Sequence, residues 1–449
     1  MIRFELERAA SIVEGRLHRP SESFEAGAFV GMTQDSRALK PGNLYCALLG
    51  ERVDGHRFVS DAAGAGAAAA LVSDVVDAPL AQIVVDDVVQ AMGRLAGAWR
   101  ASMNVRVAAI TGSNGKTTVK TMLASIMRLD APTLATRGNY NNEIGVPLTL
   151  AALGEQHRYA AIEMGCGKPG DIDYLAAMAR PDVGVVTNAG PAHLERLGSI
   201  DGVARTKGEL FAALGADDVA VINRDDDYFE YWRGLCTGSR QLGFGRSDRA
   251  DVRLDADNQV TTPAGAFTLE MALPGEHNRI NALAATAAAL ALGIDIDSIA
   301  RGLAAVGSLP GRLSEREMGG GWRLIDDSYN ANPASLHAGL QVLAVRPGKR
   351  WLAMGEMAEL GEASVRLHRE IGRAAHDLGI DRLFAIGTQA ESTADAFGAG
   401  GEAFSDMDTM ARRMQDLLEP DVTCLVKGSR SAHMEQLIDR LAAAEVTPC

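Results

Sequence analysis

A glycine-rich turn with the sequence TGSNGKTT, at residues 111–118, has the residue types and the spacing needed to bind phosphate groups. An apolar, β-rich run precedes it at residues 105–110, and a helical pattern begins at Lys116. In such a turn the backbone N–H groups point at phosphate oxygens, and the helix adds the positive end of its dipole. Lys116 can then reach the β- and γ-phosphates of a nucleotide, and the Thr117 hydroxyl can bind Mg²⁺.

The turn departs from the general P-loop pattern, because Ile110 stands where GxxxxGK[ST] has its first glycine. The alternative is a strand–turn–helix connection that contains GKT by chance, but a strand and a helix are both predicted at the right places. We therefore expect an ATP phosphate site here. Its predicted residues are Gly112, Ser113, Asn114, Gly115, Lys116, Thr117 and Thr118.

Short apolar segments alternate with helical ones around this turn and predict a central parallel sheet covered on both faces. The expected strands are residues 105–110, 159–163, 183–187 and 219–222. The central region closes with a polar β-like stretch at residues 251–273 and a helix at residues 278–292.

A second series of strands and helices starts near Leu309 and predicts an independent, doubly wound, Rossmann-like domain. Its expected strands are residues 322–325, 350–354, 382–386 and 422–426. Its helices are expected to begin near residues 333, 364, 389 and 432.

The first hundred residues predict a small α/β unit. It has β-like runs at residues 43–48, 68–72 and 82–85, and an Ala-rich helix is expected between the last two. A chain of 449 residues suggests three domains at roughly 150 residues each. We expect them at residues 1–100, 101–308 and 309–449, all of the α/β class.

The composition, 47% hydrophobic and 23% charged, is that of an ordinary globular protein and excludes intrinsic disorder and small disulfide scaffolds. The net charge of −14 argues against a general nucleic-acid binder, which needs a basic face. Anionic ligands must therefore be met by local cations, helix N-termini or metal ions.

The five cysteines are odd in number and form no CxxC pair, which fits a reducing compartment and gives no zinc signature. The N-terminal segment lacks the apolar core of a signal peptide. The two most apolar stretches, residues 62–72 and 280–294, are shorter than the roughly 18 apolar residues of a membrane span. We expect a cytoplasmic monomer without a membrane span.

The TGSNGKTT turn resembles the ATP site of the Mur ligases and of their relative folylpolyglutamate synthetase, which are three-domain, ATP-dependent, amide-forming enzymes. Four later segments resemble the same family in the same order: NYNNEIGVPLTL, AAIEMG, TNAGPAHLERLGS with ARTKGEL, and GEHNRINALAA. The N-terminal DSRALKPGNLYCALLGERVDGHRF is similar to the uridine-nucleotide domain of the members that add the third residue or the terminal dipeptide. The C-terminal DDSYNANPASL resembles the dipeptide-adding member of the family. The member that adds the third residue carries a DNPR-type signature in this domain, and this sequence has none.

The resemblance implies a ligase of peptidoglycan precursor synthesis that joins D-alanyl-D-alanine to UDP-N-acetylmuramoyl-tripeptide through an acyl phosphate, with ADP and phosphate as products. Whether the third residue of the peptide is diaminopimelate or lysine is open at this point. The alternatives are the tripeptide-forming ligase, folylpolyglutamate synthetase, a non-catalytic P-loop module and a simple kinase. The uridine-nucleotide domain counts against the folate enzyme, which lacks it.

Metal ligands are implied by the same resemblance. Glu163, at the end of a predicted strand, matches the carboxylate that binds the Mg²⁺ bridging the ATP phosphates. His193 matches a ligand of a second Mg²⁺ near the acceptor carboxylate. Lys207 matches a lysine that carries CO₂ as a carbamate, which turns a cation into a carboxylate-like ligand. Taken alone, an exposed His193 and a salt-bridged surface Lys207 are the ordinary interpretations.

Four residues outside the turn are implied to bind the nucleotide. Asn278 and Asn281 lie three apart at the start of a helix, so they share a face. Their match to the family implies that this face lies against the adenine. Arg312 and Asp327 match the pair that reaches back from the third domain to the γ-phosphate and the ribose. The pair suggests that nucleotide binding closes the third domain on the second.

The remaining candidates concern the other substrates. The uridine nucleotide is assigned to Ser36, Arg37 and His56 of the first domain, where Arg suits a diphosphate through bidentate hydrogen bonds. The peptide and the dipeptide are assigned to Tyr140, Asn141, Asn330, Asn332 and Lys427, with Lys427 placed at the dipeptide carboxylate. Turn formation alone is the competing interpretation of the asparagines, because Asn332 precedes a proline.

Overall fold

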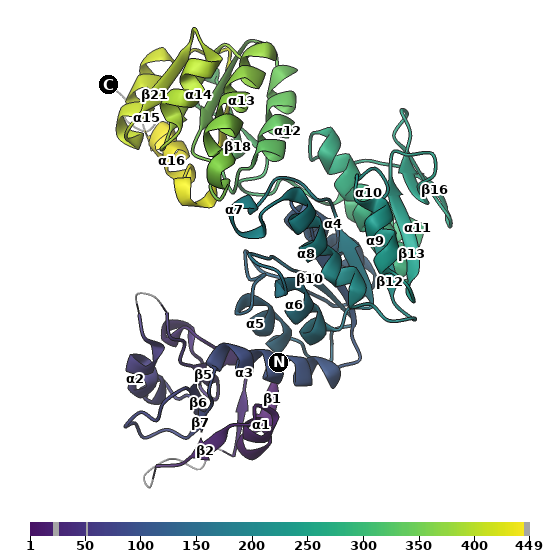
Figure 1. Cartoon of the computed structure of the whole chain (residues 1–449), viewed down its shortest axis with the longest axis vertical. Helices are drawn as coiled ribbons and strands as arrows, with labels where there is room; N and C mark the ends of the chain where they lie inside the picture. Colours follow the sequence, from purple (N-terminus) through teal and green to yellow (C-terminus); the bar gives the residue numbers. More distant parts are fainter. Residues whose placement is uncertain (21–26, 51–52, 444–449) are drawn as a thin grey trace.

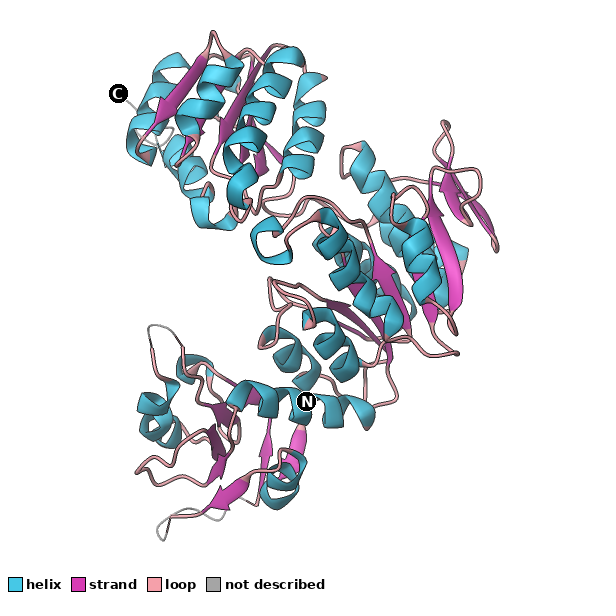
Figure 2. Cartoon of the chain, in the orientation of Figure 1, coloured by secondary structure: helices cyan, strands magenta, loops and turns pink. Residues whose placement is uncertain are grey.

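The computed structural model describes residues 1–20, 27–50 and 53–443. Cys449 and residues 51–52 of the N-terminal motif lie outside this part of the chain. Three α/β units follow one another along the chain, each built on a main sheet of its own (Figures 1 and 2). The predicted fold class, with a P-loop sheet in the centre and a Rossmann-like unit at the C-terminal end, is confirmed.

The first unit contains a two-stranded sheet, β1–β3, and a five-stranded sheet in the order β2-β7-β6-β5-β4. Its strands are β1 (Arg3–Glu5), β2 (Arg16–His18), β3 (Ala28–Val30), β4 (Met32–Thr33), β5 (Leu44–Cys46), β6 (Ala69–Val72) and β7 (Gln82–Val84). Its helices are α1 (Leu6–Ile12), α2 (Val59–Gly64) and the 3₁₀ turns η1 (Ser36–Ala38) and η2 (Gly55–Phe58). Strands β4 to β7 are parallel, and β2 runs antiparallel to β7.

The prediction of an Ala-rich helix between β6 and β7 was wrong. The alanine-rich run instead ends α2 and then supplies the fully buried strand β6, because the sheet needs small apolar side chains at its centre. Residues 73–81, between β6 and β7, form no helix, and Pro79 within them has no N–H to donate to one.

The central unit is built on a nine-stranded sheet in the order β16-β15-β14-β13-β12-β11-β8-β10-β9. Its strands are β8 (Arg106–Thr111), β9 (Thr133–Ala135), β10 (Tyr159–Glu163), β11 (Val183–Val186), β12 (Val219–Asn223), β13 (Arg240–Gly245), β14 (Val252–Leu254), β15 (Gln259–Thr262) and β16 (Gly265–Thr268). Helix α3 (Val88–Ala101) joins the first unit to the central one. The helices of the central unit are α4 (Lys116–Asp130), α5 (Gly145–Ala151), α6 (Asp171–Ala179), α7 (Leu194–Leu197), α8 (Ile200–Ala212), α9 (Phe229–Leu235), α10 (Glu276–Ala291) and α11 (Ile296–Ala304). Only the last two strands are antiparallel to their neighbours.

Strand β8 shows why the central strands read as continuous apolar runs. Ala108 and Ile110 pack into the core under α4, α10 and α11, whereas Val107 and Ala109 pack into the core under α5, α6 and α8. Alternate side chains of one strand point to opposite faces, so a strand with helices on both faces is apolar at every position.

The third unit is a six-stranded sheet in the order β17-β18-β22-β19-β20-β21, parallel except for the edge strand β17. Its strands are β17 (Ser314–Glu317), β18 (Arg323–Asp327), β19 (Lys349–Met354), β20 (Arg382–Ile386), β21 (Gly401–Phe404) and β22 (Val422–Lys427). Its helices are α12 (Pro333–Ala344), α13 (Ser364–Asp377), α14 (Ala390–Phe397), α15 (Met407–Leu417), α16 (Glu435–Ala443) and the turns η3 (Gly319–Gly321), η4 (Gly361–Ala363) and η5 (Arg430–Ala432). Helices α12 to α14 share one core and α15 and α16 the other, so both faces are covered.

The chain reverses its direction across the central sheet at β8. Strands β9 and β10 lie on one side of β8, and β11, β12 and β13 lie on the other. Ligands bind at such switch points, beyond the carboxyl ends of the strands. Helix α7 follows β11 at the boundary with the third unit (Figure 1). In the described part of the chain, no helix combines the length and the apolar character that crossing a bilayer requires.

Candidate active site

A cavity of about 760 Å³ opens beyond the carboxyl ends of β8 and β10, between the central and third units. Most of the predicted site residues line it, although they come from segments more than 300 residues apart. The predicted residues that line it are Ser113, Asn114, Gly115, Lys116, Thr117, Thr118, Asn141, Glu163, His193, Asn278, Asn281, Arg312, Asp327, Asn330, Asn332 and Lys427.

Two glycines give the phosphate turn its shape. Gly112 has a φ of +145°, and a Cβ there would lie 1.8 Å from the Thr187 hydroxyl oxygen. Gly115, which precedes the first residue of α4, has a φ of +83°, and a Cβ there would lie 2.3 Å from Oδ1 of Asn281. The turn therefore needs glycine at both positions, for backbone conformation and for space.

The loop after β11 holds the turn from outside. The backbone N–H of Asn114 donates to Oδ1 of Asn188 at 3.0 Å, and the N–H of Ser113 donates to the Asn188 carbonyl at 3.0 Å. The Thr187 hydroxyl donates to the Asn114 carbonyl at 2.5 Å. Sequence reasoning missed Asn188, although its position directly after a predicted buried strand was the available signal.

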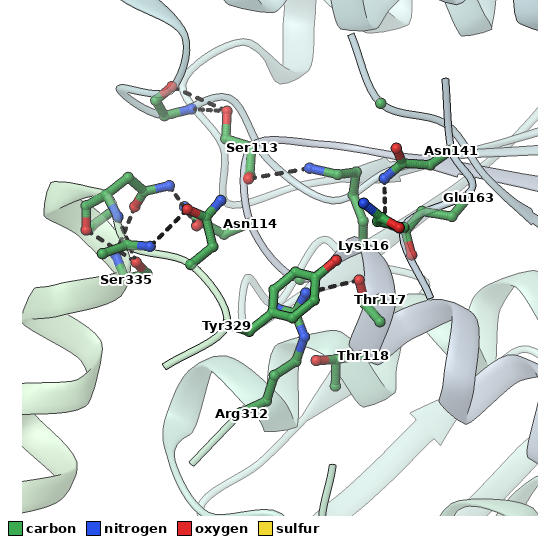
Figure 3. A pocket seen from close by; sticks show the side chains of 18 of the residues that line it. Ser113, Asn114, Lys116, Thr117, Thr118, Asn141, Glu163, Arg312, Tyr329 and Ser335 are labelled. Carbon is green, nitrogen blue, oxygen red and sulfur yellow. Dashed lines mark hydrogen bonds between the residues drawn. The ribbon is translucent and has the colours of Figure 1, made fainter. Parts of the chain in front are cut away.

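Lys116 is the first residue of α4, and its Nζ donates to the Gly112 carbonyl at 2.6 Å. It also donates toward the Ser113 carbonyl at 3.4 Å (Figure 3). Burial, followed by the nearby positive charge of Lys207, lowers the pKa of Lys116 to about 8. A negatively charged phosphate in the cavity would raise the pKa of Lys116 again, against the effects of burial and of the Lys207 charge. The side chain is therefore suited to bind an anion rather than to remain charged alone.

Glu163 ends β10 and is 2% exposed. Its Oε1 accepts a hydrogen bond of 2.8 Å from the Asn141 amide (Figure 3), whereas its buried Oε2 has no hydrogen-bond partner in the structure. A buried, unpartnered carboxylate oxygen at a cavity wall fits a bound cation, since Mg²⁺ prefers oxygen ligands. Within the described residues, no three His, Cys, Asp or Glu side chains are grouped closely enough to hold a metal alone. Most ligands of such an ion would therefore be phosphate oxygens and water.

His193 precedes α7 and lines the same cavity. Its Nδ1 is hydrogen-bonded to Oε2 of Glu359, which belongs to the third unit. Burial is the main reason that the pKa of His193 is lowered, and the positive charges of Lys116 and Lys207 lower it further, whereas Glu359 raises it. Sequence reasoning missed Glu359, because no local pattern relates it to a histidine 166 residues away.

Lys207, on α8, does not line the cavity but lies behind its wall, 1% exposed. Its Nζ donates to Sγ of Cys166 at 3.6 Å, and Cys166 itself lines the cavity. A thiol is a weak acceptor, so this contact compensates little of the ammonium charge. The alternative of a salt-bridged surface lysine does not fit this environment.

Asn278 and Asn281 are buried at the start of α10, where the Asn281 amide donates to Oδ1 of Asn278 at 3.2 Å. Arg312 crosses from the segment that enters the third unit. Its Nη2 donates to the Thr117 hydroxyl at 2.9 Å, and its guanidinium stacks on the Tyr329 ring at 4.3 Å from the centroid (Figure 3). Tyr329, within the DDSYN motif, was not selected from the sequence.

The third unit supplies a buried ion pair and a direct link to the phosphate turn. Nζ of Lys427 contacts Oδ2 of Asp327 at 2.5 Å and donates to the Asn330 carbonyl at 2.9 Å. Asn332 caps α12 and its amide donates to Oδ1 of Asn114 at 2.8 Å. The charge of Lys427 is thus already balanced by Asp327, and the role at a dipeptide carboxylate stays a prediction.

Besides Lys207, five predicted residues do not line the cavity. Gly112 belongs to the turn but is not part of the cavity wall, and Tyr140 is 46% exposed outside the cavity. Ser36, Arg37 and His56 belong to the first unit, where Arg37 pairs with Asp35 and His56 contacts Asp54 and Ser73. These last three residues can bind only a part of a substrate that extends away from the phosphate turn.

Three family models match the chain in order. The Mur ligase family catalytic domain matches residues 28–100, the Mur ligase middle domain matches residues 110–289, and the Mur ligase glutamate ligase domain matches residues 311–430. The chain is 40% identical to the UDP-N-acetylmuramoyl-tripeptide–D-alanyl-D-alanine ligase of Escherichia coli, over 98% of this chain and 99% of that protein. It is 33% identical to the protein of the same name from Bacillus subtilis, over 98% and 99% of the two chains.

The fold is also similar to solved structures of MurF proteins. A crystal structure of MurF from Acinetobacter baumannii superposes with a TM-score of 0.91 at 34% identity, covering 98% of this chain and 99% of that one. MurF from Thermotoga maritima, solved in complex with ADP, gives a TM-score of 0.82 at 26% identity, covering 93% and 98%.

Proposed function

Because the chain belongs to the Mur ligase family, we propose that it is the ATP-dependent ligase that joins D-alanyl-D-alanine to UDP-N-acetylmuramoyl-tripeptide in peptidoglycan precursor synthesis. One observation carries the proposal: the phosphate turn and the polar groups of the third unit line a single cavity. A passive ATP-binding module has no use for a second polar wall on the cavity, and a simple kinase has no second, amine substrate to place there.

We propose that residues 1–100, 101–308 and 309–449 form three domains, each of which binds a different substrate. The first part binds the uridine nucleotide through Ser36, Arg37 and His56. The second binds ATP, and the third contributes the dipeptide site and closes over the nucleotide. The contacts Arg312–Thr117 and Asn332–Asn114, which join the third unit to the phosphate turn, support this closure.

The reaction needs an activated carboxylate, because a free carboxylate has no good leaving group. An oxygen of the tripeptide carboxylate attacks the γ-phosphorus of ATP, and ADP leaves. The amine of D-alanyl-D-alanine then attacks the acyl carbon, loses its proton and expels phosphate. Lys116 and Arg312 hold the phosphates, and Asn278 and Asn281 face the adenine. Both reactants of the first step are anions, so cations must bring them together.

Thr117, Glu163 and His193 are the proposed side-chain ligands of two Mg²⁺ ions. The orphaned Oε2 of Glu163 is the observation that supports the first position. Bound Mg²⁺ would neutralise the phosphate and carboxylate charges. The asparagines Asn141, Asn330 and Asn332, with Tyr140 and Lys427, are proposed to orient the peptide and the dipeptide.

Lys207 is proposed to carry a carbamate. Its deprotonated amine would add to CO₂ with loss of a proton, placing two oxygens where the ammonium now has only a thiol partner. The burial of Lys207 and its closeness to two other basic groups, Lys116 and His193, support a negative group at this position. The positive charge of Lys207 lowers the pKa of Lys116 and of His193, whereas a negatively charged carbamate would raise both.

The deciding experiment measures nucleotide products for the purified chain with ATP, Mg²⁺, UDP-N-acetylmuramoyl-tripeptide and D-alanyl-D-alanine. ADP and phosphate should form only when all components are present. Separate reactions supply UDP-N-acetylmuramoyl-dipeptide with diaminopimelate or lysine, and a folate with glutamate. Turnover in either of those, or the formation of AMP and pyrophosphate, would contradict the proposal. Tripeptides ending in diaminopimelate and in lysine, compared by kcat/KM, identify the third residue.

A further inference from the structure

The contact between His193 and Glu359 joins the central unit to the third unit at the cavity wall. Two further observations place the same segments side by side. The Glu195 N–H donates to the Glu359 carbonyl at 3.3 Å, and a Cβ added at Gly361 would lie 3.6 Å from the Glu195 Cα. The side-chain pair is therefore part of an ordered interface rather than an isolated surface contact.

Both partners have a backbone conformation that non-glycine residues rarely adopt. The φ of His193 is +56° and the φ of Glu359 is +61°. Such residues persist where the surrounding structure holds them, and they gather at functional sites. Here two left-handed residues, one from each unit, point their side chains at one another.

The chemistry of the pair decides which ring nitrogen carries a hydrogen. A carboxylate can only accept, so Nδ1 of His193 must carry the hydrogen in its contact with Glu359. In a neutral ring with Nδ1 protonated, Nε2 has a free lone pair. Among the described residues, Nε2 has no recorded hydrogen-bond partner, and the ring lines the cavity.

We infer that Glu359 is a positioning residue: it holds His193 in the Nδ1-protonated tautomer, so that docking of the third unit presents a bare Nε2 to the cavity. Metal-binding histidines are commonly oriented in this way by a carboxylate on the other nitrogen. The metal part of the inference rests on the proposed function, but the tautomer does not. The second Mg²⁺ position would then be completed only when the third unit is docked.

The direct test is nitrogen NMR of the histidine side chains in the full chain without nucleotide, with His193→Gln used to assign the signal. The wild type should show the Nδ1-protonated tautomer at His193. Glu359→Ala should lose that preference, and Glu359→Gln should retain most of it, because its amide oxygen still accepts. Glu362→Gln, which changes an exposed glutamate three residues after Glu359, is the control and should match the wild type. An unchanged tautomer in Glu359→Ala would overturn the inference.

The second measurement is the Mg²⁺ concentration for half-maximal turnover. Loss of such an orienting carboxylate typically costs 10–100-fold in metal affinity. Glu359→Ala should raise the half-maximal Mg²⁺ by about 10–100-fold, with a smaller rise for Glu359→Gln, and with the KM for the UDP-linked peptide unchanged. Mn²⁺ binding with a non-hydrolysable ATP analogue, followed by electron paramagnetic resonance, should show the same weakening without turnover. Equal Mg²⁺ dependence in wild type and Glu359→Ala would refute the metal part. A wild type that does not turn over D-alanyl-D-alanine would refute the proposed function and leave the tautomer result standing.

Discussion

Nη2 of Arg312 donates a hydrogen bond of 2.9 Å to the hydroxyl of Thr117, across 195 residues of sequence and across the boundary between the second and third units. Tyr329 supports the guanidinium from one face. The first turn of α4, which carries Lys116 and Thr117, is thereby tied to the segment that enters the third unit. Nucleotide binding and the position of the third unit are physically linked through this arginine.

Replacement of Arg312 by lysine should therefore weaken ATP binding, because a point charge can neither stack on Tyr329 nor reproduce the planar donor fork. A charge-assisted hydrogen bond contributes about 1.5–3 kcal/mol, so the KM for ATP should rise by roughly 10–150-fold. Steady-state kinetics with saturating peptide and dipeptide provide the measurement. Arg316→Lys is the matched control, since Arg316 pairs with Asp326 outside the cavity. Equal effects of the two substitutions would contradict the link.

Nucleotide binding should take up protons near pH 8. The pKa of Lys116 is lowered to about 8, so about half of the chains lack this proton at that pH. A bound phosphate raises the pKa again, and protonation follows. Below pH 7 the side chain is already charged, and uptake from this group should vanish. Calorimetric titration with ADP in buffers of different ionisation enthalpy measures the effect. The arginine of Lys116→Arg stays charged throughout this pH range, so nucleotide binding to this variant should take up no protons near pH 8. Proton uptake equal to that of the wild type would show that another group is responsible.

Arg37→Ala should raise the KM for the UDP-linked peptide and leave ATP binding unchanged. The Arg37 side chain is 90% exposed and its neighbour Asp35 belongs to the same turn, so its removal should not affect folding. The expected loss, about 1.5–3 kcal/mol for a charge-assisted contact to a diphosphate, is roughly a 10–150-fold rise in KM. Arg8→Ala, an exposed arginine on α1 of the same unit, is the control. A parallel loss of ATP affinity in Arg37→Ala would show that the assignment of the first unit is wrong.

The carbamate on Lys207 can be separated from a simple positive charge. Lys207→Arg keeps the cation but cannot take up CO₂, so it should be as inactive as Lys207→Ala. Acetate or formate should partly restore Lys207→Ala, because a small carboxylate can enter the vacated space and supply the missing oxygens. The same acids should not restore Lys116→Ala, whose lost group is a cation at the phosphates. Near-normal turnover by Lys207→Arg, or rescue by amines instead of acids, would rule out the carbamate.

The sequence alone determined those features that depend on neighbouring residues. Strand β10 spans the predicted residues 159–163, and α4 starts at Lys116 as predicted, because burial and turn formation act over a few residues. The phosphate turn could be located for the same reason, since its glycines, lysine and threonine form one local unit. The local pattern was wrong where one composition suits two structures: the alanine-rich run, predicted as a helix, supplies a buried strand instead.

Only the tertiary structure decided which distant side chains meet. Glu359 contacts His193, Asp327 balances Lys427, and Lys207 lies against Cys166 behind the cavity wall. Each pair joins segments between 41 and 166 residues apart, and nothing in the periodicity of either segment specifies the other. These contacts follow from the strand order of each sheet and from how the units dock. That docking is set by packing over whole surfaces, a property of the folded chain that no short stretch of sequence encodes.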